Sequence, residues 1–279
     1  MIDESFLDQL SKFNLLVNKR VTSNYVGMRK SIAAGHGLIF EDHQQYAYGD
    51  DFRKIDWRVY ARSDELFIRR FEEERSTTVR IMLDSSASMQ FRKKWDYASM
   101  LAVGFAYLTM RENEKFQLLT FDKDINFFRA KRGRAHLSEM VRILNSMKNT
   151  KAGAFLKNVK ILKKQISSKS TLILISDFLY DKEEIESSLA LLKKNDLHLI
   201  QVMDEQELDF DFDGEYNFKD SESDSLMRTF VSPSMRNSYQ RGLHEHVAMV
   251  ENLAKVIGAR HTLISTKDTV FDAFYKTLS

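Results

Sequence analysis

Oxygen-bearing side chains follow two segments of the chain that have the pattern of buried strands. Asp84, Ser86 and Ser88 alternate directly after the apolar run 79–83, and Asp177 follows a second such run. A tight turn after a strand can aim side chains at positions i, i+2 and i+4 toward one centre. Carboxylate and hydroxyl oxygens are hard ligands that suit a partly hydrated Mg²⁺ or Mn²⁺. This spacing therefore predicts a divalent-metal site with an open coordination position.

The same side chains have simpler interpretations. Aspartate and serine are good helix N-caps, so the cluster at residues 84–88 could cap the helix that follows it. Asp177 could be a turn residue. A metal could also activate a water for hydrolysis, but we find no convincing general base near the motif.

The elements that would position these residues alternate regularly from residue 77 onward. Apolar or β-branched runs predict strands at residues 79–83, 116–121, 171–175, 197–203 and 261–264. Helical spacing predicts helices at residues 95–111, 137–147, 155–166, 185–194, 235–257 and 270–278. This alternation predicts an α/β fold with a doubly wound, mostly parallel sheet covered on both faces. Such sheets bind ligands outside the carboxyl ends of their strands, where Asp84 and Asp177 fall.

Two parts of the chain depart from this alternation. Residues 204–233 are acidic and predict an excursion, such as a hairpin. At the other end, residues 5–20 predict a short amphipathic helix, and residues 21–76 look irregular apart from a possible strand at 66–71.

The segment 21–76 is rich in charged and aromatic residues. Asp50, Asp51 or Asp56 could be a catalytic acid, but structural ion pairs are the favoured interpretation. The nearby basic partners are Arg53, Arg58 and Arg62. Trp57 would then anchor the segment on the sheet domain by burying aromatic area.

The composition limits the class of protein. The chain has 279 residues, 43% of them hydrophobic, and a net charge of +2. This balance gives no pull toward nucleic acid, so we expect no nucleic-acid partner. The absence of cysteine excludes disulfides, thiol catalysis and thiolate metal sites. No Gly-x-x-x-x-Gly-Lys loop is present, so any ATPase activity would belong to a partner.

The hydropathy pattern predicts no membrane span. The longest apolar-rich stretch, residues 100–110, is shorter than the roughly 20 residues that a spanning helix needs. The N-terminus carries acids and lacks a basic start followed by an apolar run, so we do not interpret it as a signal peptide. We expect a cytoplasmic protein.

The sequence Asp84-Ser85-Ser86-Ala87-Ser88 resembles the Asp-x-Ser-x-Ser motif of von Willebrand factor type A domains. The resemblance implies a metal-ion-dependent adhesion site, completed by a threonine and an aspartate from two other loops. Asp177 matches the aspartate, and Thr150 matches the threonine. The segment after Thr150 departs from the family pattern at Phe155, and another register would put Ala154 at the threonine position. The implied ligands of Mg²⁺ or Mn²⁺ are Asp84, Ser86, Ser88, Thr150 and Asp177; Thr150 could instead be only a helix N-cap.

A second resemblance extends over the N-terminal part. Residues 48–57 (Tyr-Gly-Asp-Asp-Phe-Arg-Lys-Ile-Asp-Trp), Ala61-Arg62 and 71–74 (Phe-Glu-Glu-Glu) are similar to the signature of a bacterial family, domain of unknown function 58. That family places the signature just before a type A domain. The resemblance implies an N-terminal extension at residues 1–76 and a type A-like domain at 77–279. Family members are commonly encoded beside MoxR-type AAA+ ATPases, which implies such an ATPase or its client as the partner.

Together these observations favour a non-enzymatic protein-interaction module, an adaptor that works with the ATPase. Two alternatives stay open. One is a metal-assisted hydrolase, and the other is a scaffold whose degenerate site is empty and whose N-terminal signature forms the interface.

Overall fold

The computed structural model describes residues 2, 5, 6, 8–10, 39–48, 50–72, 78–147, 152–166, 169–212, 214–219 and 226–278. The chain forms two compact units. Met1–Thr22 and Thr77–Ser279 make up the larger unit, and Ser23–Ser76 make up the smaller one.

A six-stranded sheet is the centre of the larger unit. Its strands are β3 (Thr78–Asp84), β4 (Lys115–Phe121), β5 (Ile125–Phe127), β6 (Thr171–Ser176), β7 (Asp196–Met203) and β10 (Arg260–Ser265). Their order across the sheet is β10-β7-β6-β3-β4-β5. β5 is antiparallel to β4 at one edge, and the other pairs are parallel. The predicted doubly wound, mostly parallel sheet is confirmed, with β5 as a short strand that the sequence pattern did not reveal.

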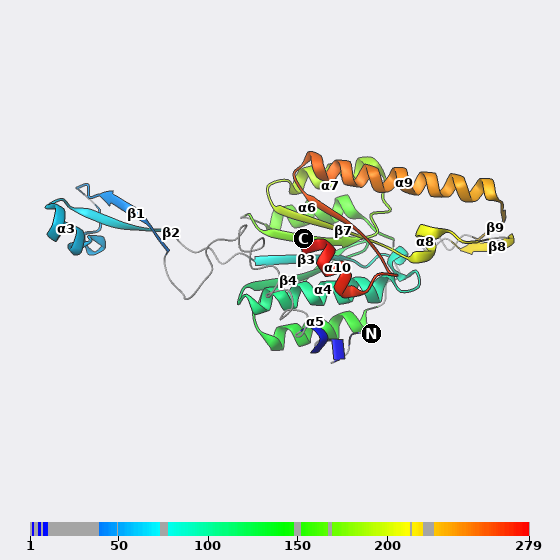
Figure 1. Cartoon of the computed structure of the whole chain (residues 1–279), viewed down its shortest axis with the longest axis horizontal. Coiled ribbons are helices and arrows are strands. Elements are labelled where there is room, and N and C mark those ends of the chain that lie inside the picture. Colours follow the sequence, from blue (N-terminus) through cyan, green and yellow to red (C-terminus); the bar gives the residue numbers. More distant parts are fainter. Residues whose placement is uncertain are drawn as a thin grey trace. The chain divides into compact units, whose positions relative to one another are not determined.

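Helices cover both faces of this sheet (Figure 1). One layer consists of α4 (Lys94–Arg111), α5 (Arg134–Ser146) and α10 (Val270–Leu278), and the opposite layer of α6 (Phe155–Gln165), α7 (Lys182–Leu192) and α9 (Pro233–Val256). Each layer contributes to its own cluster of buried hydrophobic residues. Because both faces are covered, all six residues of β6 are buried, which explains its nearly continuous apolar sequence.

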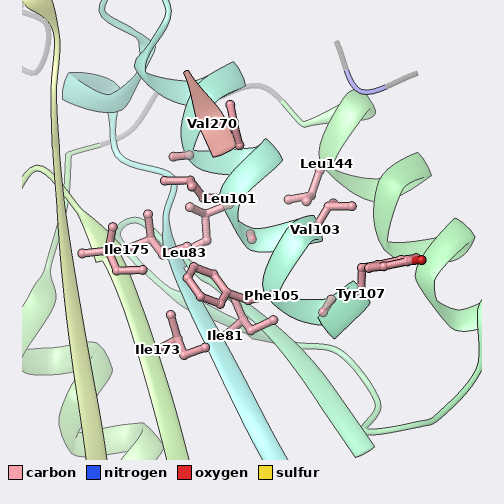
Figure 2. Packing of buried hydrophobic residues seen from close by; sticks show 14 of the residues in the cluster. Ile81, Leu83, Leu101, Val103, Phe105, Tyr107, Leu144, Ile173, Ile175 and Val270 are labelled. Carbon is pink, nitrogen blue, oxygen red and sulfur yellow. The ribbon is translucent and has the colours of Figure 1, made fainter. Parts of the chain in front are cut away.

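Successive side chains of β3 point to opposite faces of the sheet and pack against the two helix layers in turn. Ile81 and Leu83 belong to the cluster that contains α4, and Met82, between them, belongs to the cluster on the other face. Figure 2 shows Ile81 and Leu83 among side chains of β6 and of α4, including Phe105. The packing of β3 fixes the end of the strand, where Asp84 lies.

The excursion after β7 contains a short helix and a hairpin. α8 (Glu205–Asp209) is followed by β8 (Gly214–Lys219) and β9 (Leu226–Val231), which pair antiparallel. The predicted hairpin is confirmed, and α8 is an addition to it.

The smaller unit contains a two-stranded antiparallel sheet. β1 (Ile39–Gln45) pairs with β2 (Phe67–Glu72), and between them lie a 3-10 turn at Phe52–Lys54 and the helix α3 (Trp57–Ser63). The strand predicted at 66–71 is confirmed in β2. The prediction of irregular structure was wrong for β1 and α3, because β1 carries mostly polar residues and α3 buries none.

The first residues of the chain pack with the larger unit. Ile2, Phe6 and Leu10 are buried in the cluster that contains α4. The predicted helix at residues 5–20 is helical where it is described up to residue 10, and its remainder lies outside the described residues. In the ranges that the structure describes, no helix is both long and apolar enough to cross a membrane.

Candidate functional site

The candidate site lies where the connections of the sheet change direction. The chain runs outward from β3 through β4 and β5 on one side, and from β6 through β7 and β10 on the other. In doubly wound sheets the crevice for ligands opens at this point, outside the carboxyl ends of the two central strands. Asp84 is the last residue of β3, and Asp177 directly follows β6. The fold therefore brings the two predicted carboxylates to neighbouring strand ends.

Asp84 is fully buried and accepts three hydrogen bonds. The backbone N–H of Ser86 donates to its Oδ1 at 2.8 Å. The hydroxyls of Ser176 and Tyr180 donate to its Oδ2 at 2.6 and 2.7 Å. Burial and, after it, the negative charge of Asp177 raise the pKa of Asp84 to about 6, although the hydrogen bonds oppose this change. Hydrogen bonds thus fix the position of the carboxylate, but they do not fully compensate its negative charge.

The hydroxyls of Ser86 and Ser88 form a hydrogen bond with each other, which places their oxygens 3.1 Å apart. Adjacent ligands of an octahedral Mg²⁺ lie about 2.1 Å from the ion and hence about 3 Å from each other. Neither hydroxyl acts as a helix cap: Ser86 precedes the 3-10 turn Ala87–Gln90 without a capping side-chain bond, and α4 has Lys93 at its N-cap. Asp84 does not cap a helix either, because its bond to the Ser86 N–H is an Asx turn that precedes the N-cap position of the 3-10 turn.

Asp177 is bound to a lysine inside the protein. Lys94 Nζ lies 2.9 Å from Asp177 Oδ2 and 2.7 Å from Glu207 Oε1, and the lysine side chain is fully buried. Burial alone lowers the pKa of Lys94, but the attraction of the two carboxylates outweighs it and raises that pKa above its ordinary value. Asp177 Oδ1 accepts a bond from the N–H of Leu179 at 3.2 Å, which is the turn role considered from the sequence.

Tyr180 closes one side of Asp84. Its ring stacks on Phe155 with centroids 5.3 Å apart, and a Cβ at Gly153 would come within 2.3 Å of its hydroxyl oxygen. Burial, followed by the charge of Asp84, raises the pKa of Tyr180, so the phenol stays a hydrogen-bond donor. Phe155, the residue that departs from the type A pattern, is thus the one whose ring packs against Tyr180.

The residues present fit a divalent cation of the predicted kind. A desolvated carboxylate stands beside two hydroxyl oxygens with the spacing of adjacent octahedral ligands. Within the described ranges, no three histidine, aspartate or glutamate side chains form a metal-binding group, so a metal here would depend on hydroxyl ligands. Thr150 lies outside the described residues, and its role as a ligand stays a prediction.

The structure adds Ser176, Tyr180, Lys94 and Glu207 to the residues predicted from the sequence. One of them carried a signal: Lys94 lies on the apolar stripe of its helix, three and four residues before the buried Tyr97 and Ala98. A lysine in a buried stripe needs a charged partner. Ser176 and Tyr180 lie within three residues of the predicted Asp177, but their bonds to Asp84 and the contact of Glu207 with Lys94 span long sequence separations, which no local pattern reveals.

The acids of the smaller unit bind backbone groups. Asp51 and Asp56 accept bonds from the N–H groups of Arg53 and Arg58, which caps the local turn and α3. Trp57 is 60% exposed, and its packing on the sheet domain stays a prediction. As the first residue of α3, Trp57 lies on a helix without buried residues.

Comparison with known proteins identified a family model and several relatives. The model described as "Protein of unknown function DUF58" matches residues 42–249. Uncharacterized protein Rv1480 of Mycobacterium tuberculosis is 23% identical over 265 residues, which cover 92% of this chain and 84% of that protein. Uncharacterized protein YeaD of Bacillus subtilis is 24% identical over 133 residues, which cover 48% of this chain and 32% of that protein.

Solved structures with a similar course of the chain are more distant in sequence. The conserved hypothetical protein BatB from Bacteroides thetaiotaomicron is 12% identical, with a TM-score of 0.45, over 72% of this chain and 97% of that one. The SpRpn10 VWA domain is 10% identical, with a TM-score of 0.44, over 71% of this chain and 93% of that one.

Proposed function

Because the family model spans most of the chain, the protein belongs to the DUF58 family, and on that premise we propose that it is a protein-interaction module with a divalent-metal site. The ligands would be Asp84, Ser86, Ser88 and Thr150, with Asp177 completing the set. The observation that carries the proposal is the Ser86–Ser88 hydroxyl pair beside a buried carboxylate at the switch point of the sheet. Mg²⁺ or Mn²⁺ bound there would supply an open coordination position for a carboxylate of the partner protein.

The surroundings of the site support contact with a protein. Phe91, just after the serine motif, is 39% exposed, and Leu179, just after Asp177, is 46% exposed. A cavity of about 370 Å³, lined in part by Arg92, Asp204 and Thr266, adds a concave, charged surface.

We favour binding over catalysis. A metal-assisted hydrolase needs a general base beside the metal, and Glu207, which binds Lys94 next to Asp177, is the candidate for it. Both of its oxygens are engaged: Lys94 donates to Oε1, and the N–H of Asp204 donates to Oε2 at 2.8 Å. Each oxygen thus already accepts one hydrogen bond, and although burial raises the pKa of Glu207, the charge of Lys94 opposes protonation of the carboxylate.

The metal proposal is tested by calorimetric titration with Mg²⁺ and Mn²⁺. We expect Ser86→Ala and Ser88→Ala to weaken binding by about tenfold or more, because each removes one direct ligand. Ser85→Ala is the matched control. Its hydroxyl lies in the same motif, is buried and has no hydrogen-bond partner, so binding should not change. Equal affinity of all three variants and the unmodified protein would contradict the proposal.

For the partner, we propose a MoxR-type AAA+ ATPase or its client, as the family resemblance implies. The chain has no Gly-x-x-x-x-Gly-Lys loop of its own, and an AAA+ ATPase works where ATP is present, so we propose a cytoplasmic location. Affinity capture with the purified ATPase should succeed in Mg²⁺ and fail with chelator or with Ser86→Ala. Capture that is unchanged by chelator would instead support the scaffold with an empty site.

A further inference from the structure

Lys94 is a buried cation next to the candidate metal site. Lysine is seldom fully buried, because removing its charge from water costs more than most contacts return. Here the ammonium has two short contacts, 2.9 Å to Asp177 and 2.7 Å to Glu207. A third neighbour is the ring of Phe91, whose centroid lies 5.8 Å from Nζ.

These contacts join three loops at the carboxyl ends of the strands. Lys94 begins α4 after β3, Asp177 follows β6, and Glu207 belongs to α8 after β7. Glu207 is itself fixed, because it forms a capping box with Asp204 at the start of α8. The ammonium of Lys94 therefore links the loops after β3 and β6, which carry the proposed metal ligands, to α8 in the segment after β7.

The site already contains one positive charge, the ammonium of Lys94, before any metal ion binds. Three carboxylates, Asp84, Asp177 and Glu207, influence one another electrostatically through Asp177. With the ammonium of Lys94 they leave two negative charges, which one divalent cation would neutralise. Without Lys94 they would leave three.

We propose that Lys94 is a resident cation of the site: its ammonium holds the three loops together in the absence of metal and lowers the affinity for the divalent cation. This inference rests on the proposed metal-binding function and deepens it. Such a site is organised before the metal binds, but it binds the metal weakly. The carboxylate of the partner would then supply a further ligand and raise the affinity for the metal. Lys94 is a positioning residue here, since its buried side chain cannot touch the partner.

Calorimetric titration with Mg²⁺ tests the proposal through the signs of three changes. We expect Lys94→Met to bind Mg²⁺ about tenfold or more tightly, because a repelling charge is removed. Glu207→Gln should bind about tenfold more weakly, because an attracting charge is removed. The double variant should return close to the unmodified affinity, and Lys93→Met, at the exposed neighbouring lysine, should leave it unchanged.

A lysine that only held the loops in place would give a different result. Its loss would loosen the ligands, so both single variants would bind more weakly and the double variant more weakly still. That pattern, or an unchanged affinity of Lys94→Met, overturns the proposal.

A second measurement separates this inference from the proposed function. In chelator, we expect Lys94→Met to unfold at a lower temperature and the double variant to regain part of the loss, because Glu207→Gln removes one unpaired charge. If the unmodified protein binds no Mg²⁺, the proposed function fails, and this recovery still decides whether Lys94 balances charge. The absence of recovery overturns the role of Lys94. If Lys94→Met does not fold in chelator, the double variant decides, and a Mg²⁺ affinity well below that of the unmodified protein overturns the proposal.

Discussion

At the scale of single residues, Asp84 shows why hydrogen bonds alone do not stabilise a buried charge. Three donors reach its carboxylate, yet its pKa rises to about 6, because burial and Asp177 outweigh the bonds from Ser176 and Ser86. Compared with the unfolded chain, the metal-free protein therefore holds an extra proton between about pH 4 and pH 6. The folded protein destabilises the ionised form of Asp84, and a bound cation would stabilise that form.

This gives a prediction for pH dependence. Since the folded pKa of Asp84 is raised from 3.8 to about 6, ionisation costs stability as the pH rises through this window, by about 3 kcal/mol once complete. In chelator at pH 8, we expect Asp84→Asn to be more stable than the unmodified protein by up to about 3 kcal/mol. The difference should shrink as the pH falls from 6 to 4, measured by urea unfolding with Trp95 fluorescence.

Addition of Mg²⁺ is the control for this prediction. The cation stabilises the ionised carboxylate, so at pH 8 the unmodified protein should gain stability and Asp84→Asn should not. A stability difference that stays constant with pH would show that the aspartate is not the titrating group.

The sequence predicted the residues of this site that lie beside strands and missed those that join it from a distance. Asp84 and Asp177 were identifiable because each ends an apolar run, and the sheet order brings the two runs together. Tyr180 lies three residues after Asp177, but this spacing does not indicate its bond to Asp84, and nothing close to Glu207 in sequence indicates its contact with Lys94. Such contacts depend on the paths of the loops, which are set by the packing of the whole unit.

At the scale of elements, the contact between α4 and α10 depends on one glycine. A Cβ at Gly104 would lie 1.9 Å from the tip of the Phe274 ring, which is fully buried. Gly104→Ala should therefore destabilise the larger unit by about 1–3 kcal/mol despite the better helix propensity of alanine. The free energy of unfolding in urea is the measurement.

Gly242 provides a matched helix position. It lies in α9, is exposed, and no atom comes within 4 Å of a Cβ placed there. Gly242→Ala should stabilise the protein by about 0.5–1 kcal/mol, because only the helix propensity changes. A gain at Gly104 similar to that at Gly242 would mean that α10 can move away from α4 at little cost.

Strands with buried faces were predictable from the sequence, and strands at edges were not. β6 is buried along its whole length and reads as a continuous apolar run. β5 has three residues at the edge of the sheet, two of them exposed, and β1 is mostly polar. Hydrophobic patterning reports burial, so an element that buries little leaves little trace in the sequence.

At the scale of the whole molecule, the two units differ in how much hydrophobic side chain they bury. The larger unit has two extensive buried clusters. Among the side chains of the smaller unit that the structure describes, which leave out those of residues 39–43, 54 and 69–72, the buried hydrophobic ones are Ile55 and Ile68. Small units bury a smaller fraction of their surface and are correspondingly less stable.

We therefore predict that the smaller unit opens before the larger one. Native-state hydrogen exchange in increasing urea should show α3 losing protection at a midpoint lower by about 1 M urea or more than α4. Ile55→Ala, which truncates a side chain that is 4% exposed, should reduce the protection of α3 further and leave α4 unchanged. Leu101→Ala, at a fully buried position of α4, should reduce the protection of α4 by about 2–5 kcal/mol. If both helices instead lose protection together in both variants, the two units fold as one cooperative structure, and the exposed aromatic residues around Trp57 would not belong to a separately stable part.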